Sequence, residues 1–288
     1  MSQPAQDHWP GDLGTLRAEI DRIDDEIHEL LMRRATVVGR LAASGAKNGV
    51  PLRPGREAAI LRRLLARHSG DLPAQAVVRI WRELLAGTTA MQGGLVVAVC
   101  EADPGGGFAA AAREQFGALT PVRVHGTVAQ AIVDVRAGRA SVAVLPLPSE
   151  TESPGDAWWM PLLRDDQPRI HVVARLPFWR CRAEGTPSAQ ALAVAAMSPD
   201  PSGEDRTLLG LELDRDVSQE RLTAALGAVG LHAGQVILHR DAGVSVAHAL
   251  ADVPGYLAAG DSRLSGLGCV LRPPALIGAY AVPLGAGA

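Results

Sequence analysis

The strongest constraint on the fold is a stripe of apolar residues with helical spacing near the start of the chain. Most of its members stand three or four residues apart, which places them on one face of an α-helix. They are Leu13, Leu16, Ile20, Ile23, Ile27, Leu30, Leu31, Val38 and Leu41. The Gly- and Pro-containing stretch "SGAKNGVPLRPG", residues 44–55, predicts a loop. We therefore expect one long amphipathic helix ahead of that loop.

Two shorter helices are predicted after the loop. The first runs to about His68, where "SGDLP" interrupts the pattern, and Pro73 opens the second. The second has an apolar stripe of its own, made of Val77, Ile80, Trp81, Leu84 and Leu85. Two glycines at 93–94 end it. Residues 10–93 are therefore predicted to form an all-α domain of three helices.

The pattern changes at Leu95, where short apolar strands begin to alternate with helical segments. "LVVAV", "VRVHG" and "SVAVLPLP" are the strands, and a glycine loop, "DPGGG", leads into one of the helices. This alternation predicts an α/β region over residues 95–200, with a mostly parallel sheet covered by helices. Residues 201–286 follow the order β-α-β-β-α-β, which predicts a ferredoxin-like α+β module. The expected fold class is therefore multidomain.

Composition excludes several functions. The net charge of −3 gives no electrostatic reason to expect nucleic acid or an anionic membrane as a partner. The three cysteines lie far apart, so neither a disulfide framework nor a metal motif is visible. The first residues lack the basic start and apolar core of a signal peptide, and no apolar run reaches the ~20 residues of a membrane helix. We expect a soluble, cytoplasmic protein.

Two arginines break the apolar stripe of the first helix. Arg34 stands seven residues after Ile27 and four before Val38, and Arg17 stands three before Ile20. A buried charge is costly unless it is paired. Arg17 and Arg34 are ~25 Å apart along one helix, so a single helix cannot bring both to one small ligand. Two antiparallel copies in a dimer would do so, and the pattern leaves open an anion site between helices or internal salt bridges.

Other polar residues also stand at unexpected positions. Thr88 and Gln92 are four residues apart and continue the apolar stripe of the third helix. Arg53 and Arg56, beside Glu57, stand at the start of the second helix, where the helix dipole disfavours cations. The same helix start attracts anions. The pattern alone does not separate a ligand site from surface arginines in solvent.

These segments resemble a known family. "LRAEIDRIDDEIHELLMRR", "LRPGREAAILRRLL" and "WRELLAGTTAMQ" resemble the three helices of the all-helical chorismate mutases. The resemblance implies an intertwined homodimer with shared active sites. It also implies conversion of chorismate to prephenate in phenylalanine and tyrosine biosynthesis, by a [3,3]-sigmatropic (Claisen) rearrangement. Neither a cofactor nor a metal is implied.

The resemblance assigns a role to each matching residue. Arg17, given by the partner subunit, and Arg34 would bind the carboxylates of the substrate. Arg56 and Glu57 match a paired Arg-Glu whose glutamate binds the substrate hydroxyl. Thr88 and Gln92 match a hydroxyl and a glutamine of the third helix, with the glutamine near the ether oxygen. The expected catalytic residues include Glu57 and Gln92.

Two positions depart from the family's pattern. A lysine that contacts the ether oxygen is expected about eleven residues after Arg34, where this chain has Gly45. Lys47, the only lysine of the chain, stands two residues further, and we expect it to take the catalytic role. Arg53 stands where the family often has an acidic residue, so hydroxyl recognition would rest more on Glu57.

The remainder weakly resembles prephenate dehydratase followed by its ACT regulatory domain. Gln190, Ala191 and Leu192 stand at the Thr-Arg-Phe positions of that family, which implies a degenerate, inactive dehydratase. The ACT-like region would take an amino-acid effector, typically phenylalanine, although "ELDRDVSQERL" lacks the usual Gly-Ala-Leu turn. The glycines at 105–107 are a weak nucleotide-binding signal, and we interpret His125 and His171 as structural.

Two alternative functions remain open. Isochorismate-pyruvate lyases share the helical scaffold of the mutases. A non-catalytic sensor would bind a ligand in the ACT-like region and use its helices only to dimerise. The full set of polar residues at the expected positions favours an enzyme over the sensor, and the shifted lysine is the main argument against the mutase.

Overall fold

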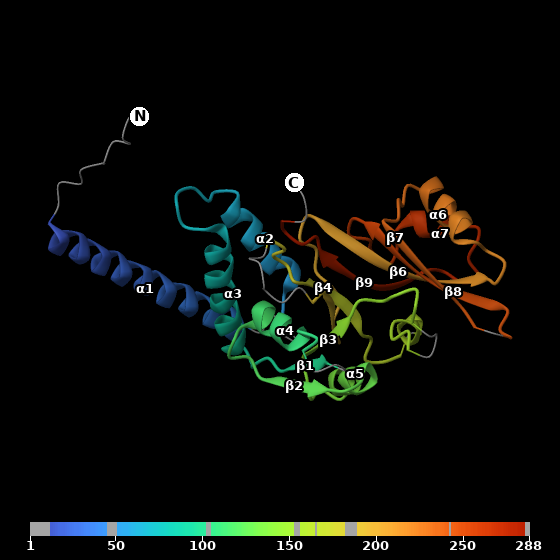
Figure 1. The fold of residues 1–288 in the computed structure, drawn as a ribbon, viewed down its shortest axis with the longest axis horizontal. Coiled ribbons are helices and arrows are strands. Elements are labelled where there is room, and N and C mark those ends of the chain that lie inside the picture. Colours follow the sequence, from blue (N-terminus) through green and yellow to red (C-terminus); the bar gives the residue numbers. More distant parts are fainter. Residues whose placement is uncertain are drawn as a thin grey trace. The chain divides into compact units, whose positions relative to one another are not determined.

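A computed structural model describes residues 12–44, 51–101, 105–152, 156–164, 166–181, 189–241 and 243–285 (Figure 1). The chain divides into two compact units, Met1–Asn48 and Gly49–Ala288. Each unit is described by itself below.

The first unit is represented by one helix, α1, which spans Leu13–Ala43 and is 31 residues long. This confirms the long helix predicted from the apolar stripe. No residue of α1 is buried, and its apolar residues are widely exposed, with Leu13 at 60% and Leu30 at 62%. Arg22 forms ion pairs with Glu19 and Glu26 along the helix surface. No helix among the described residues has the length and apolar character that crossing a membrane requires.

The second unit begins with the two shorter predicted helices, α2 (Pro54–Leu65) and α3 (Ala74–Ala90). Pro54 occupies the first turn of α2, where its missing N–H leaves no hydrogen bond unmade. The two helices pack against each other, and α2 also packs on the sheet of this unit. Ala58, Leu61 and Val78 form a small core with Phe178 and with Ala281 at the end of the last strand. These two helices are therefore part of the same compact unit as the sheet.

The described strands of this unit form one sheet in the order β2-β1-β3-β5-β4-β9-β6-β8-β7 (Figure 1). Their bounds are β1 Val97–Cys100, β2 Val122–His125, β3 Val142–Pro146, β4 His171–Leu176, β5 Ala191–Ala195, β6 Asp205–Asp214, β7 Gln235–Arg240, β8 Val246–Pro254 and β9 Ala275–Ala281. The remaining helices are α4 Phe108–Phe116, α5 Val128–Arg136, the 3₁₀ turn η1 Met160–Leu163, α6 Gln219–Ala228 and α7 Ser262–Ser265.

The first half of the sheet is mixed rather than mostly parallel. β1 pairs in parallel with β2 and β3, and α4 and α5 lie in the connections. β3 pairs with β5, and β5 with β4, in antiparallel fashion. The prediction of a mostly parallel sheet is therefore wrong for β4 and β5. Two consecutive parallel strands are joined by a crossover connection, usually a helix, whereas antiparallel strands need none. No described residue between β4 and β5 is helical.

The helices α4 and α5 cover opposite faces of this half-sheet. Along β1, Ala98 belongs to one apolar cluster, whereas Val97 and Val99 belong to another, as expected when successive side chains point to opposite faces. The cluster of Ala98 includes Ala131 of α5, and the other includes Phe116 of α4. Figure 1 shows the two helices beside these strands. The sheet is thus buried on both sides here.

The second half has the predicted β-α-β-β-α-β order, formed by β6, α6, β7, β8, α7 and β9. Its strands lie in the order β9-β6-β8-β7 and all pair antiparallel. The sheet continues into the first half through a parallel pairing of Val172 in β4 with Gly278 in β9. Gly278 has a φ of +152°, and a Cβ there would lie 2.1 Å from the Val172 carbonyl oxygen.

The domain boundary between residues 200 and 201 stays a prediction.

Carboxylates and histidines of the first half have structural partners. Glu101 accepts hydrogen bonds from the N–H groups of Gly107 (2.8 Å) and Ala109 (3.3 Å) at the start of α4. An internal carboxylate therefore occupies the helix start after the glycine loop, and the weak nucleotide-binding signal does not correspond to an open anion site. His125 contacts Asp134 (3.0 Å), and His171 Nδ1 contacts the Met197 carbonyl (2.9 Å), in keeping with structural roles.

The buried phenol of Tyr280 makes the free energy of unfolding depend on pH in the alkaline range. Its hydroxyl donates to Asp252 (2.7 Å) and accepts from Arg175 (3.2 Å). Burial, followed by the Asp252 charge, raises the pKa of Tyr280 from 10.0 to about 12. Between these two pKa values the folded chain binds more protons than the unfolded chain. The stabilising contribution is therefore complete below the unfolded pKa and is lost as the pH rises through the folded pKa.

We expect urea unfolding to show a loss of stability between about pH 10 and about pH 12 that is smaller in Tyr280→Phe. Phenylalanine keeps the ring but removes the titrating hydroxyl. The same loss of stability in both proteins would contradict this prediction.

Candidate functional site

The two arginines predicted to bind carboxylates lie on one uninterrupted helix. Arg17 is near the start of α1 and Arg34 is in its second half. At 1.5 Å per residue they are ~25 Å apart along the axis. One copy of α1 therefore cannot bring both to a small ligand. Their joint action in one site stays a prediction that requires a second copy of the chain.

The start of α2 already holds a carboxylate from the same chain. Asp200, in the segment between β5 and β6, accepts hydrogen bonds from the N–H groups of Gly55 (3.0 Å) and Arg56 (3.1 Å). These N–H groups have no partner within a helix, and the helix dipole favours a negative charge there. The interpretation that this helix start attracts a substrate anion is therefore wrong for the two N–H groups. The side chain of Arg56 is exposed.

Glu57 is buried against an arginine that the sequence analysis did not identify. Arg82 of α3 donates from Nη1 to Glu57 Oε2 at 3.0 Å, and Arg82 is only 5% exposed. The Arg82 guanidinium also lies over the Phe178 ring, 5.0 Å from its centroid. Burial lowers the pKa of Arg82, and the charges of Glu57 and Glu114 act against that shift. The partners depend on each other, because a buried charge without its counter-ion is strongly destabilising.

Arg82 had a signal in the sequence that could have identified it. It stands four residues after Val78 and three before Leu85, and both of these side chains are buried. A charge between two buried helix positions needs a partner, which is the argument that identified Arg34. The partner itself was not visible, because Glu57 lies 25 residues away on another helix.

A second arginine fixes the other end of α2 to the sheet. Arg62 donates to the Ser202 hydroxyl (2.8 Å), the Glu204 carbonyl (2.9 Å) and the Val282 carbonyl (2.8 Å). Together with Asp200, these contacts hold α2 at its first and last turns. The helix that carries Glu57 is therefore fixed by the segment between β5 and β6 and by Val282 after β9.

The polar residues at the end of α3 bond to local backbone groups. The Thr88 hydroxyl donates to the carbonyls of Leu84 and Leu85, each at 3.0 Å. Gln92 Nε2 donates to the Thr88 carbonyl at 2.8 Å, as the four-residue spacing leads one to expect. Thr88 lies ~9 Å along the helix axis from Arg82. The structure thus brings Thr88 to Gln92, and Glu57 to Arg82, at different levels of α3.

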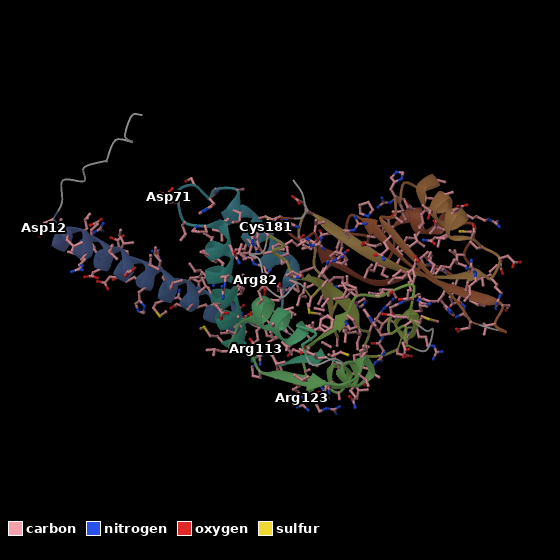
Figure 2. All side chains as sticks on the ribbon, in the orientation of Figure 1. Asp12, Asp71, Arg82, Arg113, Arg123 and Cys181 are labelled. Carbon is pink, nitrogen blue, oxygen red and sulfur yellow. The ribbon has the colours of Figure 1, made fainter. Side chains whose placement is uncertain are left out.

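Lys47 lies outside the described residues, and the structure does not place it. All seven candidate residues fall within positions 17–92 of the sequence. They are Arg17, Arg34, Lys47, Arg56, Glu57, Thr88 and Gln92. Of the residues discussed in this subsection, Figure 2 labels Arg82, the partner of Glu57, on α3.

Residues 16–93 match the family model described as "Chorismate mutase type II". This stretch contains every candidate residue and includes α2, α3 and nearly all of α1. The chain carries a chorismate mutase domain at its N-terminus. The mutase domain extends over residues of both compact units.

Two curated relatives carry the name "Bifunctional chorismate mutase/prephenate dehydratase". The protein from Aquifex aeolicus is 32% identical over 147 residues, which are 49% of this chain and 40% of the relative. The protein from Neisseria gonorrhoeae is 34% identical over 140 residues, 47% of this chain and 37% of the relative. The match thus spans less than half the length of either relative, so their complete activities do not transfer to this chain.

The fold also resembles a solved structure of prephenate dehydratase from Streptococcus mutans. The TM-score is 0.47 at 12% sequence identity, over 65% of this chain and 97% of that one. At this level of similarity, no activity follows from the likeness.

Proposed function

We propose that this protein is a chorismate mutase that rearranges chorismate to prephenate in aromatic amino acid biosynthesis, in the cytoplasm. The observation that carries the proposal is the mutase family match over residues 16–93, which includes every candidate polar residue. The identity to bifunctional enzymes whose names include this activity supports it.

The residue types fit a rearrangement that needs orientation and charge stabilisation rather than a covalent enzyme intermediate. Arg17 and Arg34 supply planar guanidinium groups, which bind carboxylates with two parallel hydrogen bonds. Holding both carboxylates of chorismate fixes a compact conformer with its reacting ends together. In the proposed site, Arg56 and Thr88 add polar contacts to the bound substrate.

Three further residues contact the oxygen atoms of the substrate in the proposed site. The ether oxygen gains negative charge as the C–O bond breaks, so donors from Lys47 and Gln92 stabilise the transition state more than the ground state. Glu57 accepts a hydrogen bond from the substrate hydroxyl. Its Oε2 already accepts a hydrogen bond from Arg82, and a carboxylate has further acceptor positions for the substrate hydroxyl.

The exposed face of α1 supports a homodimer with shared sites. A 31-residue helix with no buried residue and an apolar stripe interrupted by only two arginines needs a partner surface to be stable. A second copy of α1, packed antiparallel, provides that surface. It also brings Arg17 of one chain toward Arg34 of the other.

The deciding experiment incubates the purified chain with chorismate and identifies the products by mass spectrometry. We expect chorismate to be consumed above the uncatalysed rate and prephenate to be the product. Isochorismate is supplied in a parallel reaction, and release of pyruvate there would favour the lyase. Consumption of neither compound would contradict the mutase and favour the non-catalytic sensor.

The β6–β9 module, Asp205–Ala281, supports an ACT-like regulatory role with an amino-acid effector, typically phenylalanine. Its support is the β-α-β-β-α-β order and the antiparallel strand order β9-β6-β8-β7. Equilibrium dialysis with labelled phenylalanine tests this role separately from catalysis. Absence of saturable binding would contradict phenylalanine as the effector.

We expect no phenylpyruvate from prephenate. At the positions of the dehydratase Thr-Arg-Phe motif, Ala191 and Leu192 are buried in β5 and carry no polar group. The Gln190 amide oxygen accepts from Arg175 at 3.2 Å. These side chains supply neither a hydroxyl nor a cation for removal of water and carbon dioxide. Accumulation of phenylpyruvate at neutral pH, followed by its absorbance, would contradict the inactive dehydratase.

Sharing of the site between subunits predicts complementation. Arg17→Ala and Arg34→Ala homodimers should both have little activity. After subunit exchange, a heterodimer contains one site with both arginines and one site with neither, so activity should reappear in the mixture. Native mass spectrometry of differently tagged chains verifies that exchange occurred. Verified heterodimers without activity would contradict sharing.

A further inference from the structure

A cavity of about 410 Å³ lies between α3 and α4, beside the residues that follow β4. Its volume falls within the range of sites that bind small molecules. The side chains considered below are Val78, Arg79, Arg82 and Glu83 from α3, Ala111, Arg113, Glu114 and Gln115 from α4, and Phe178 and Trp179. Figure 2 labels Arg82 and Arg113, one on each of the two helices. Thr88 and Gln92, the candidate residues at the end of α3, do not line the cavity.

Gln115 brings to the cavity a side-chain amide that the described residues leave without a partner. It is 7% exposed and lines the cavity. Its side-chain amide forms no hydrogen bond with any residue in the described part of the chain. An amide that faces a cavity without a protein partner is available to hydrogen-bond a ligand or water. Arg82, which is also buried and lines the cavity, adds a cationic donor.

The charges at the rim favour an anion. Arg79 and Arg113 are exposed, and neither forms an ion pair with another residue that the structure describes. The two lining carboxylates are engaged: Glu83 accepts from the Ala118 N–H at 2.9 Å and 3.3 Å, and Glu114 has its own partner. The rim therefore offers two unpaired guanidinium groups, the cations best suited to a carboxylate.

The apolar side chains that line the cavity favour a ligand with a flat apolar group. Phe178 and Trp179 line the cavity together with Val78 and Ala111. Aromatic walls bury a ring by stacking or edge-to-face contact. We propose that this cavity binds an aromatic carboxylate, with its ring against Phe178 and Trp179, its carboxylate at the rim arginines and a hydrogen bond to Gln115. The proposal concerns binding and does not rest on the mutase activity.

The test is a calorimetric titration of the full chain with 3-phenylpropionate. Propionate lacks the ring, and 3-phenyl-1-propanol lacks the charge, so each control compound removes one of the two recognised features. We expect saturable binding of 3-phenylpropionate and at least ~10-fold weaker binding of either control compound, as for the loss of one charged or aromatic anchor. Binding that does not saturate, or equal binding of the three compounds, would overturn the proposal.

Variants locate the binding. Gln115→Leu and the double substitution Arg79→Gln with Arg113→Gln should each weaken binding at least ~10-fold, and the double variant changes only exposed side chains. Arg221→Gln, an exposed arginine on α6, is the matched control and should bind like the wild type. The variant Arg34→Gln distinguishes this cavity from the mutase site. Binding that survives the double substitution but is lost in Arg34→Gln would show that the probe occupies the mutase site, and would overturn the proposal even if the protein is a mutase.

Discussion

Replacing Gly55 by alanine is expected to displace the start of α2 and to destabilise the protein by about 1–3 kcal/mol. A Cβ at this position would lie 2.1 Å from the Asp200 carbonyl oxygen and 2.9 Å from that of Pro201. Both are backbone atoms, so no side-chain rotation relieves the contact. A shift of α2 would also break the hydrogen bonds from Gly55 and Arg56 to Asp200 and would move Glu57. Urea unfolding measures the loss.

Two matched variants separate the steric effect from other causes. Gly227 lies in α6, and a Cβ there would meet only a side-chain atom of His232 at 3.8 Å. Gly227→Ala should therefore leave stability unchanged or raise it, because alanine favours helices over glycine. Asp200→Ala removes the cap without a clash and should cost about 1 kcal/mol. A Gly55→Ala protein as stable as the wild type would show that the contact with Asp200 is not close in solution.

Local patterns predicted the elements of this fold well, because the periods of helices and strands are properties of neighbouring residues. The spacing of apolar residues identified α1, and the β-α-β-β-α-β order of residues 201–286 was predicted in the same way. The relative directions of paired strands were harder to predict from local patterns. β4 and β5 are antiparallel, and their directions depend on how the connection between them runs rather than on their own sequences.

The candidate site also combines contacts that local patterns predict with contacts that they do not predict. Thr88 and Gln92 are four residues apart, and their hydrogen bond follows from helix geometry. The partner of the α2 start was not predicted, because Asp200 lies 145 residues from Gly55. Arg82 and Glu57 were likewise separated by a loop and a helix boundary. Sequence spacing finds polar residues that need partners, whereas the partners are supplied by tertiary packing.

The second large effect is expected at Lys47, and it rests on the proposed mutase activity. Charge on the ether oxygen appears only as the C–O bond breaks, so a cation there acts mainly in the transition state. Lys47→Ala should therefore lower kcat and kcat/KM together, by about 100-fold or more, with little rise in KM. Stopped assays with chorismate give both constants.

Variants at and beside this position separate a catalytic lysine from a solvated loop lysine. Lys47→Arg keeps the charge but changes its shape and its hydrogen-bond geometry, so it should recover only part of the rate. Asn48→Ala changes the adjacent residue without removing a cation and should keep near-wild-type kcat. If Lys47→Ala also keeps near-wild-type kcat while the wild type is an active mutase, the lysine assignment is wrong. Gln92, together with Arg53, would then have to stabilise the ether oxygen, and Gln92→Ala would show the larger loss.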